Sequence, residues 1–350
     1  ALQIGALLSL FQISRIFAPN VLGWVADQSG EYIKWIKVSS FFGFIIFMGI
    51  FWSNTFINIF IVMMAMSIFT SSTLPLAESL TLSHLKANKA DSKYSHIRLW
   101  GSIGFIVAAL LLGVMIDSYG ERSLIYALLI TQFIIFLLAF ILPPKKVIFT
   151  KNTKRSIWPI LKQREVIVLL LSCALMVSSH GLLYNFYSIF LEEQGYSGAS
   201  IGLLWSVGVV FEILIFLLMP KILSKFTLKA VLLISLGFAV IRFFLIGAYV
   251  DSLVVLILAQ IMHAATFGSF HVASIQLIAH FFYEEHQARG QSLYNSITYG
   301  VGGAIGGLGG GYMIEYSGMA NTFMISAIIP FIGFFVLMLG LKTKFKAELK

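Results

Sequence analysis

The chain has 350 residues, of which 59% are hydrophobic and only 11% are charged. An ordinary soluble domain is about 45–50% apolar, so this composition excludes a chain that water surrounds on all sides. The formal net charge of +9 does not indicate nucleic-acid binding, because the basic residues gather in particular connections, and the single cysteine, Cys173, excludes a disulfide framework.

Apolar runs of about 20 residues recur along the chain, and each is long enough as a helix to cross a hydrocarbon core of about 30 Å. We therefore predict an all-α membrane protein with eleven spans. In chain order the spans cover 2–26, 35–54, 56–84, 97–118, 122–142, 165–191, 199–220, 228–248, 252–280, 291–314 and 320–341.

The connections between these spans alternate in charge. All Lys and Arg residues except Arg15, Arg122 and Arg242 lie in every second connection or in the C-terminal tail, whereas the opposite connections hold acids such as Asp117 and Glu192. Basic connections stay in the cytoplasm. This asymmetry predicts a multi-pass protein of the plasma membrane, the inner membrane of a bacterium, with the lipid bilayer as a partner. A solvated basic patch for other partners is the alternative.

The longest polar stretch, 143–164, is rich in Lys and Pro and predicts a cytoplasmic linker between two bundles. Shifting the second half onto the first by 197 residues aligns Gly5 with Gly202 and Arg15 with Glu212. This parallel repeat predicts five spans in 1–142, six in 165–341, a basic tail at 342–350, and a sixth helix of the first bundle that precedes Ala1.

The connection after the first span contains Gly23, Asp27, Gly30 and Lys34, and it resembles the G-x-x-x-D-R-x-G-x-K/R motif of the major facilitator superfamily. The resemblance extends over the whole chain and implies that superfamily's fold, with two six-helix bundles and these four residues in a gating loop. Gln28 stands where the motif has arginine, so the charge pair that the motif implies is absent at that position.

Three longer stretches resemble the phenylpropionate permease group: RLWGSIGF at 98–105, GYSGASIGLLWSVGVVFE at 195–212 and QIMHAATFGSFHVA at 260–273. A more distant resemblance, to the lactose permease family, rests on Pro75, Glu78, Arg98, Trp100 and Gly101. It implies that Glu78 and Arg98 bind substrate. The alternative for Arg98 is an anchor at the membrane interface.

Four charged residues, Arg15, Glu78, Glu212 and Arg242, lie within predicted spans. Such residues are costly in a bilayer and normally face a bundle interior or a watery cavity. We expect Glu212 to line a central cavity and to exchange a proton, because burial raises a carboxyl pKa whereas Arg15 or Arg242 lowers it. The alternative is a buried ion pair between Arg15 and Glu212 that only fixes helix packing.

Two histidines fall in one later span. His263 matches a histidine of the lactose permease family, but Thr266 and Gln260 replace that family's glutamate and lysine, which weakens a proton relay along this helix. His271 follows by eight residues, about 80° round an α-helix, so both rings reach one cavity. We place His263 with the buried charges, and His271 and Gln260 with the substrate-binding residues.

His180, Tyr184 and Tyr187 lie on one helical face, which suits stacking of an aromatic substrate. The alternative for Tyr187 is an aromatic belt at the membrane interface. The glycine cluster at 299–312 has neither the preceding strand nor the Lys-Ser/Thr of a phosphate loop. Its four-residue spacing predicts close packing between helices.

The combined prediction is a permease that moves a small organic solute together with a proton by alternating access. Resemblance to the phenylpropionate permease group favours an aromatic carboxylic acid, and a sugar or a nucleoside is the alternative. We expect no cofactor and no metal, since the proton gradient supplies the driving force, and we expect a monomer. The sequence has no motif of an intramembrane enzyme. A membrane sensor that does not transport is a remote alternative.

Overall fold

The computed structural model describes residues 2–87, 94–143, 157–282 and 287–342. Within these ranges every regular element is a helix, as expected where backbone N–H and C=O groups must be satisfied inside a bilayer. The elements are α1 (Leu2–Ser29), α2 (Tyr32–Met48), η1 (Gly49–Trp52), α3 (Phe56–Ala87), α4 (Tyr94–Tyr119), α5 (Arg122–Leu138), α6 (Trp158–Leu161), α7 (Arg164–Glu193), α8 (Gly198–Lys225), α9 (Leu228–Ala248), α10 (Leu253–Ile261), η3 (Ala264–Ser269), α11 (Phe270–Phe281), α12 (Gln287–Asn295), η5 (Ser296–Gly302), α13 (Gly303–Ser326) and α14 (Ile328–Gly340).

The predicted spans fall on these helices. In the described ranges nine helices are long and apolar enough to cross a membrane, and Arg122–Leu138 is a shorter apolar helix at the position of the fifth prediction. The last two predictions fall on one continuous stretch, Arg289–Gly340. It is interrupted at Gly318, whose φ of 77° is open to glycine but strained for other residues.

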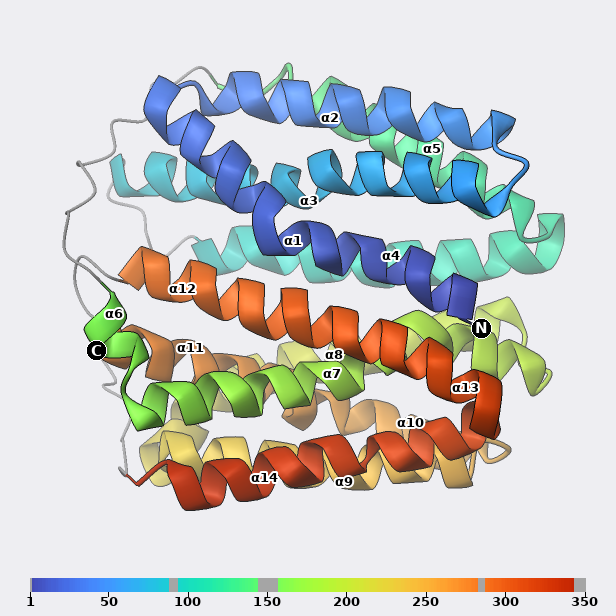
Figure 1. The fold of residues 1–350 in the computed structure, drawn as a ribbon. Helices are drawn as coiled ribbons and strands as arrows, with labels where there is room; N and C mark the ends of the chain where they lie inside the picture. Colours follow the sequence, from blue (N-terminus) through green and yellow to red (C-terminus); the bar gives the residue numbers. More distant parts are fainter. Residues whose placement is uncertain (1, 88–93, 144–156, 283–286, 343–350) are drawn as a thin grey trace.

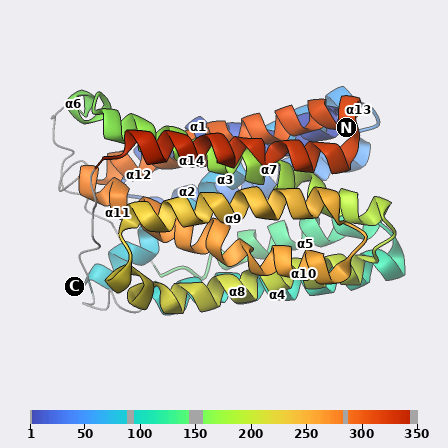
Figure 2. The same cartoon turned by 90° about the horizontal axis from the view of Figure 1, so that it is seen from below.

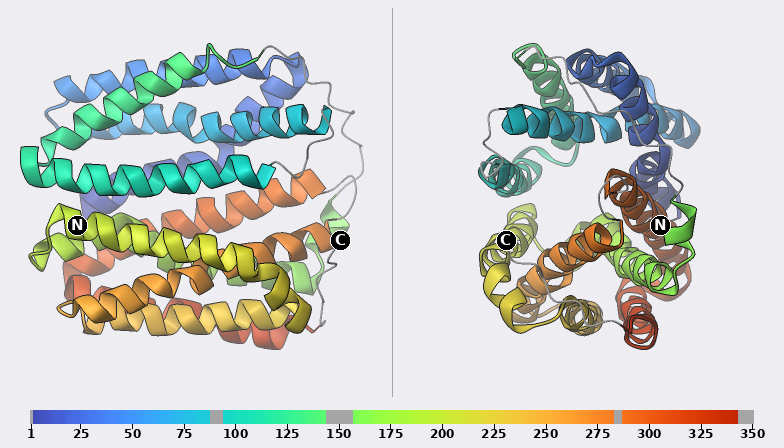
Figure 3. Two further views of the ribbon diagram at one scale, coloured as in Figure 1. Left: turned by 180° about the vertical axis from the view of Figure 1, so that it is seen from behind. Right: turned by 90° about the vertical axis from the view of Figure 1, so that its left-hand side faces the viewer.

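The helices form two groups that lie side by side (Figure 1). We refer to α1–α5 as the first half and to α7–α14 as the second half. An end-on view separates the two groups clearly (Figure 3). The halves meet along two lines, where α4 packs on α8 and where α1 packs on α13 and η5. The first of these lines is visible in Figure 2, in which α4 and α8 run next to each other.

Helix starts in the second half carry the residues that capping requires. The side chains of Ser197, Thr227 and Ser252 precede α8, α9 and α10, and each accepts a hydrogen bond from the backbone N–H three residues later. Such a cap satisfies one of the four N–H groups that a helix start leaves without an intrahelical partner. These starts are therefore fixed locally by the sequence.

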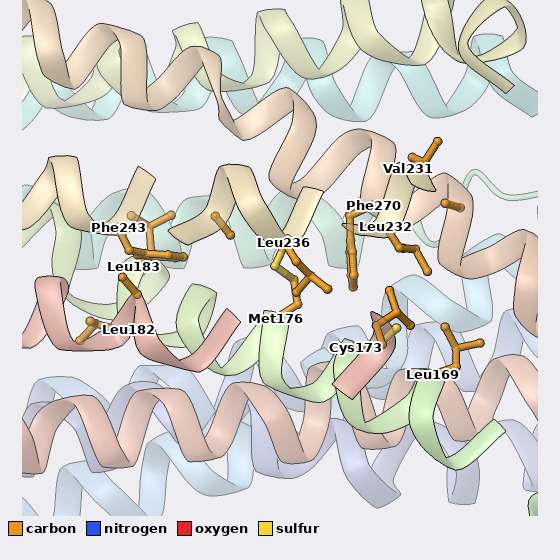
Figure 4. Packing of buried hydrophobic residues seen from close by; sticks show 14 of the residues in the cluster. Leu169, Cys173, Met176, Leu182, Leu183, Val231, Leu232, Leu236, Phe243 and Phe270 are labelled. Atoms are coloured by element: carbon orange, nitrogen blue, oxygen red, sulfur yellow. The ribbon is translucent and has the colours of Figure 1, made fainter. Parts of the chain in front are cut away.

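The central helix of the second half is α7. In its most apolar stretch, 72% of the residues are buried inside the protein. Leu169, Cys173 and Met176 on α7 pack against Leu232 and other apolar residues of α9 (Figure 4). A helix that is apolar on all sides is stable when it is buried on all sides. This is why α7 occupies the centre of the second half. The residues of α7 that are polar must then find partners inside the protein.

The glycines of η5 and α13 allow this helix to approach α7 very closely. A Cβ added at Gly306 would stand 1.9 Å from the carbonyl oxygen of Ser178, and one at Gly302 would stand 2.6 Å from that of Ala174. Only glycine fits at such separations, so the packing interpretation of this cluster is confirmed.

One end of the molecule carries Asp117, Glu192 and Asp251, and we call it the acidic end. There the two carboxylate oxygens of Asp117, on α4, accept hydrogen bonds from the N–H groups of Gly198 (2.6 Å) and Ala199 (2.8 Å), in the first turn of α8. The carboxylate also faces the positive end of the α8 dipole. These bonds tie the two halves together at the acidic end.

Two glycines aligned by the sequence repeat lie at crossings between the halves. A Cβ at Gly202, on α8, would stand 2.3 Å from the carbonyl oxygen of Ala109 on α4. A Cβ at Gly5, on α1, would stand 2.8 Å from the carbonyl oxygen of Gly307 on α13. Each aligned glycine thus permits one of the two close contacts between the halves.

Two predicted segments lie partly outside the described residues. Of the linker at 143–164, the described part includes the short helix α6, and residues 144–156 are outside. Of the tail at 342–350, residues 343–350 are outside.

Candidate substrate and proton site

Arg242 is the largest fully buried side chain of the described residues and lies on α9, inside the second half. A guanidinium buried in this way requires acceptors for its five N–H groups. Its acceptors are the carbonyl oxygen of Ala259 (2.8 Å, from Nε), Gln260 Oε1 (3.2 Å, from Nη2), and Thr266 Oγ1 (3.1 Å), His263 Nδ1 (3.1 Å) and His180 Nε2 (3.4 Å), all three from Nη1.

The partners of the two histidines fix which ring nitrogen carries the proton. His180 Nδ1 lies 2.9 Å from the carbonyl oxygen of Met176, which can only accept, so Nδ1 donates and Nε2 accepts. Arginine can only donate, so His263 Nδ1 is the acceptor of Arg242 and the ring proton of His263 sits on Nε2. Both imidazoles are therefore neutral beside the guanidinium.

The proton-bearing nitrogen of His263 points at Glu212. Nε2 lies 3.6 Å from Glu212 Oε2, and the side chain of Glu212 is only 13% exposed. The imidazole of His263 thus lies between a buried cation and a nearly buried carboxylate: Nδ1 accepts from Arg242, and Nε2 faces Glu212 at 3.6 Å.

Gly208 and Gly268, on the two helices that meet at Glu212, allow the helix of His263 to approach α8 closely. A Cβ at Gly208, one turn before Glu212 on α8, would stand 3.1 Å from Gln260 Oε1 and 3.6 Å from His263 Cβ. A Cβ at Gly268 would stand 2.4 Å from Ile215 and 3.5 Å from Glu212 Cγ. The helix that carries His263 is therefore packed tightly against α8 over this whole stretch.

The helix that carries His263 and His271 contains a π-helical turn, η3, between them. The expected offset of about 80° between the two rings assumed a continuous α-helix, which this π-helical turn interrupts. The wider turn places His263, Phe267 and His271 in a stack, with centroid distances of 5.3 and 5.9 Å and interplanar angles of 9° and 7°. Turns of this kind are rare and gather at functional sites.

The stack leads towards Arg15, on the first half. His271 Nδ1 lies 3.0 Å from the hydroxyl of Tyr299, which belongs to the second π-helical turn, η5. The guanidinium of Arg15 lies over the rings of Tyr299 and Phe11, 5.6 Å from each centroid. Glu78, on α3, is within electrostatic range of Arg15. The ring stack of the second half thus ends, through Tyr299, at the cation Arg15 of the first half.

The aromatic face predicted on α7 is divided in the structure. Tyr184 is 39% exposed, and its hydroxyl is within electrostatic range of Arg15, Arg242 and Glu212. His180 and Tyr187 are buried, at 2% and 0% exposure. The alternative of an interfacial belt for Tyr187 is therefore wrong, because this side chain lies inside the second half.

Trp205 lies within the stretch 195–212 but is not among the residues predicted for the site. The indole stacks on Tyr184 with a centroid distance of 6.1 Å, meets Tyr187 edge-on at 5.4 Å, and donates from Nε1 to Ser188 Oγ at 3.0 Å. The available signal was its place seven residues before Glu212, two turns away on the same helical face.

Some predicted residues lie away from this group. The predicted gating loop is mostly helix, since α1 continues through Gly23 and Asp27 to Ser29, and Gly30, with φ 67°, makes the turn into α2. Lys34 pairs with Glu31 at 3.0 Å on the surface. The side chains of Asp27 and Arg98 are outside the described part. In that part no group of three or more His, Cys, Asp or Glu side chains is placed to hold a metal.

Comparisons with known proteins agree on the class of molecule. A model of the MFS_1 like family matches residues 1–325. The "Probable 3-phenylpropionic acid transporter" of Escherichia coli (strain K12) is 29% identical over 334 residues, which are 93% of this chain and 86% of that protein. The "Nucleoside permease NupG" of the same organism is 24% identical over 337 residues, 89% of this chain and 79% of that protein.

A crystal structure of a mutant of the nucleoside transporter NupG superposes on the chain with a TM-score of 0.86. The match covers 97% of this chain and 91% of that one, at 21% sequence identity. At that identity the likeness establishes the fold and not the substrate.

Proposed function

Because the chain belongs to the MFS_1 like family, we propose that it carries a small aromatic carboxylate across the membrane together with a proton. The chain is a major facilitator secondary transporter, an all-helical, multi-pass integral membrane protein, and not an enzyme. The proton coupling and the substrate are our inference from the site.

One observation carries this proposal, the balance of charge inside the spans. Two cations, Arg15 and Arg242, and two carboxylates, Glu78 and Glu212, lie within the spans, so their charges cancel when both acids are ionised. When Glu212 takes up a proton, two positive charges face one negative charge. A net charge is costly in a bilayer, and binding one monoanion removes it. Proton and carboxylate therefore favour each other's binding.

The geometry around Glu212 supports its role as the proton acceptor. The N–H of His263 is directed at its carboxylate from 3.6 Å, and the ring is held in place by the buried guanidinium of Arg242. An ionised Glu212 is stabilised by that N–H and, through the ring, by the cation. Protonation removes this stabilisation and frees the positive charge of Arg242 to act on an approaching anion.

Arg15 is the residue that we infer meets the carboxylate of the substrate. It lies over aromatic rings and is of intermediate burial, whereas Arg242 already has five acceptors and no exposed surface. Arg98 is a second candidate from the sequence resemblance. His180, Tyr187 and Gln260 are buried around Arg242, so we infer that they support the site, while Tyr184 and His271 border the substrate.

The proposal includes alternating access between two bundles, residues 1–142 and 165–341, that rock around this site. The basic linker at 143–164 and the tail at 342–350 lie in the cytoplasm in this proposal. The carrier acts as a monomer.

A nucleoside or a sugar is the second candidate substrate. Glu78 favours it, because a carboxylate suits hydroxyl groups better than it suits an anion. Relatives at comparable coverage include a nucleoside permease. A neutral substrate carried with a proton, however, leaves the loaded site with the net charge described above.

This difference in charge gives the test. We would reconstitute the protein into liposomes and measure uptake of labelled 3-phenylpropionate, with protein-free liposomes as the control for passive entry of the acid. An imposed pH gradient should drive accumulation, whereas an inside-negative potential set with valinomycin should have little effect, because one proton and one monoanion carry no net charge. Uptake of uridine that is accelerated by the potential, with no uptake of 3-phenylpropionate, would establish the second candidate instead.

A further inference from the structure

We propose that Trp205 is a specificity-determining residue, whose indole ring stacks with the aromatic ring of the substrate. This inference rests on the proposed function, because it assigns one residue of the same site to the apolar part of an aromatic carboxylate. It starts from three observations: the position of Trp205 relative to Glu212, the fixed orientation of its ring, and the exposure of its stacking partner.

Trp205 and Glu212 lie on one face of α8, since seven residues are nearly two full turns. Gly208 lies between them near that face, where Gln260 and His263 pack against the helix, so Trp205 is separated from Glu212 by these polar side chains. A helical residue seven positions nearer the helix start is about 10 Å away along the axis. The indole therefore lies about 10 Å from Glu212 in the direction of the acidic end, a separation comparable to the length of a ring with a short acid chain.

Three contacts hold the indole in one orientation. Its N–H donates to Ser188 Oγ at 3.0 Å, its edge meets the ring of Tyr187 at an interplanar angle of 90°, and its face is inclined by only 25° to the ring of Tyr184. A tryptophan in an interfacial belt directs its N–H to the wet interface instead. The internal hydrogen bond and the partly buried ring of Trp205 favour a defined binding surface.

Tyr184 connects this surface to the charged groups. It is the half-exposed member of an otherwise buried face on α7, and its hydroxyl is within electrostatic range of Arg15 and Glu212. A substrate ring placed against Trp205 and Tyr184 would direct its acid chain towards Arg15. Stacking of aromatic rings contributes about 0.5–1.5 kcal/mol beyond the burial of area, which corresponds to about a 2- to 12-fold change in affinity.

The test compares two ligands with the same acid chain, 3-phenylpropionate and 3-cyclohexylpropionate, by calorimetric titration of the purified full-length protein. Wild type should prefer the phenyl compound. Trp205→Leu should weaken binding of the phenyl compound by about 2- to 12-fold and binding of the cyclohexyl compound by less than 2-fold. Trp52→Leu, a change at a 72% exposed tryptophan, should leave both affinities unchanged.

Equal weakening of both ligands in Trp205→Leu, or no weakening, would overturn the role of Trp205. No binding of 3-phenylpropionate by wild type would instead overturn the proposed substrate, and this inference with it, so the two failures are distinct. A conservative variant covers the case in which Trp205→Leu does not fold. In Trp205→Phe the substrate-induced change in tryptophan fluorescence should disappear, whereas in Trp52→Phe it should remain. Persistence of that change in Trp205→Phe would contradict the proposal.

Discussion

Substitution of Gly306 by alanine tests whether the close contact of α13 with α7 stabilises the protein. The added Cβ would lie 1.9 Å from the carbonyl oxygen of Ser178, so the helices must separate by roughly 1 Å or more to reach an ordinary contact. Forcing a methyl group into a well-packed contact costs about 1–3 kcal/mol. Alanine also gains helix propensity over glycine, by about 1 kcal/mol, which partly masks that cost.

Gly309 provides the matched control, because a Cβ there meets no described atom within 4 Å. The propensity gain is common to Gly306→Ala and Gly309→Ala, so their difference isolates the packing cost of about 1–3 kcal/mol. In a domain of 150–250 residues each kcal/mol shifts Tm by about 2–4 °C. We expect the apparent Tm of Gly306→Ala, measured in detergent at one scan rate, to lie roughly 2–12 °C below that of Gly309→Ala. Equal values would refute the packing argument.

Three further changes test other contacts. Asp117→Asn replaces one of the two accepting oxygens with an NH2 group that can only donate, and it removes the charge. The apparent Tm should therefore fall by several degrees, while Glu121→Gln at the same end should leave it unchanged. Arg242→Lys keeps the charge but loses the planar fork, leaving buried acceptors unsatisfied at about 1–3 kcal/mol each; its Tm should fall at every pH from about 5 to 8, and an unchanged Tm would contradict the described network. Tyr299→Phe keeps the ring beneath Arg15 and should reduce substrate affinity less than Tyr299→Leu does in the same titration; the reverse order would exclude the cation–ring contact as the important one.

Much of the fold was predictable because it depends on local properties of the chain. Runs of apolar residues predict helices that span a bilayer, and the four-residue spacing of glycines such as Gly306 predicts close helix packing. The repeat that aligns Gly5 with Gly202 also identified two positions at which the halves cross. Each of these signals can be read from one short stretch of the sequence or from the comparison of two such stretches.

The candidate site was predictable only in part. The four charges within spans were evident, but their partners are distant in sequence. Nothing local shows that the acceptors of Arg242 are neutral groups, among them the imidazoles of His180 and His263. The π-helical turn that stacks His263 on Phe267 was missed because sequence periodicity was read at the α-helical value. Trp205 was missed because a tryptophan in an apolar span is equally typical of core packing.

The central claim is that Glu212 carries the proton that couples transport to the gradient. The most direct measurement uses Glu212→Gln in proteoliposomes, with two assays on one preparation: exchange of labelled for unlabelled substrate at equal pH, and accumulation against a gradient driven by pH. Glutamine fills nearly the same volume and keeps an acceptor oxygen for the N–H of His263 to face, but it does not take up a proton in this range. We predict that exchange persists while accumulation is lost. Accumulation as high as in wild type would contradict the assignment of the proton to Glu212.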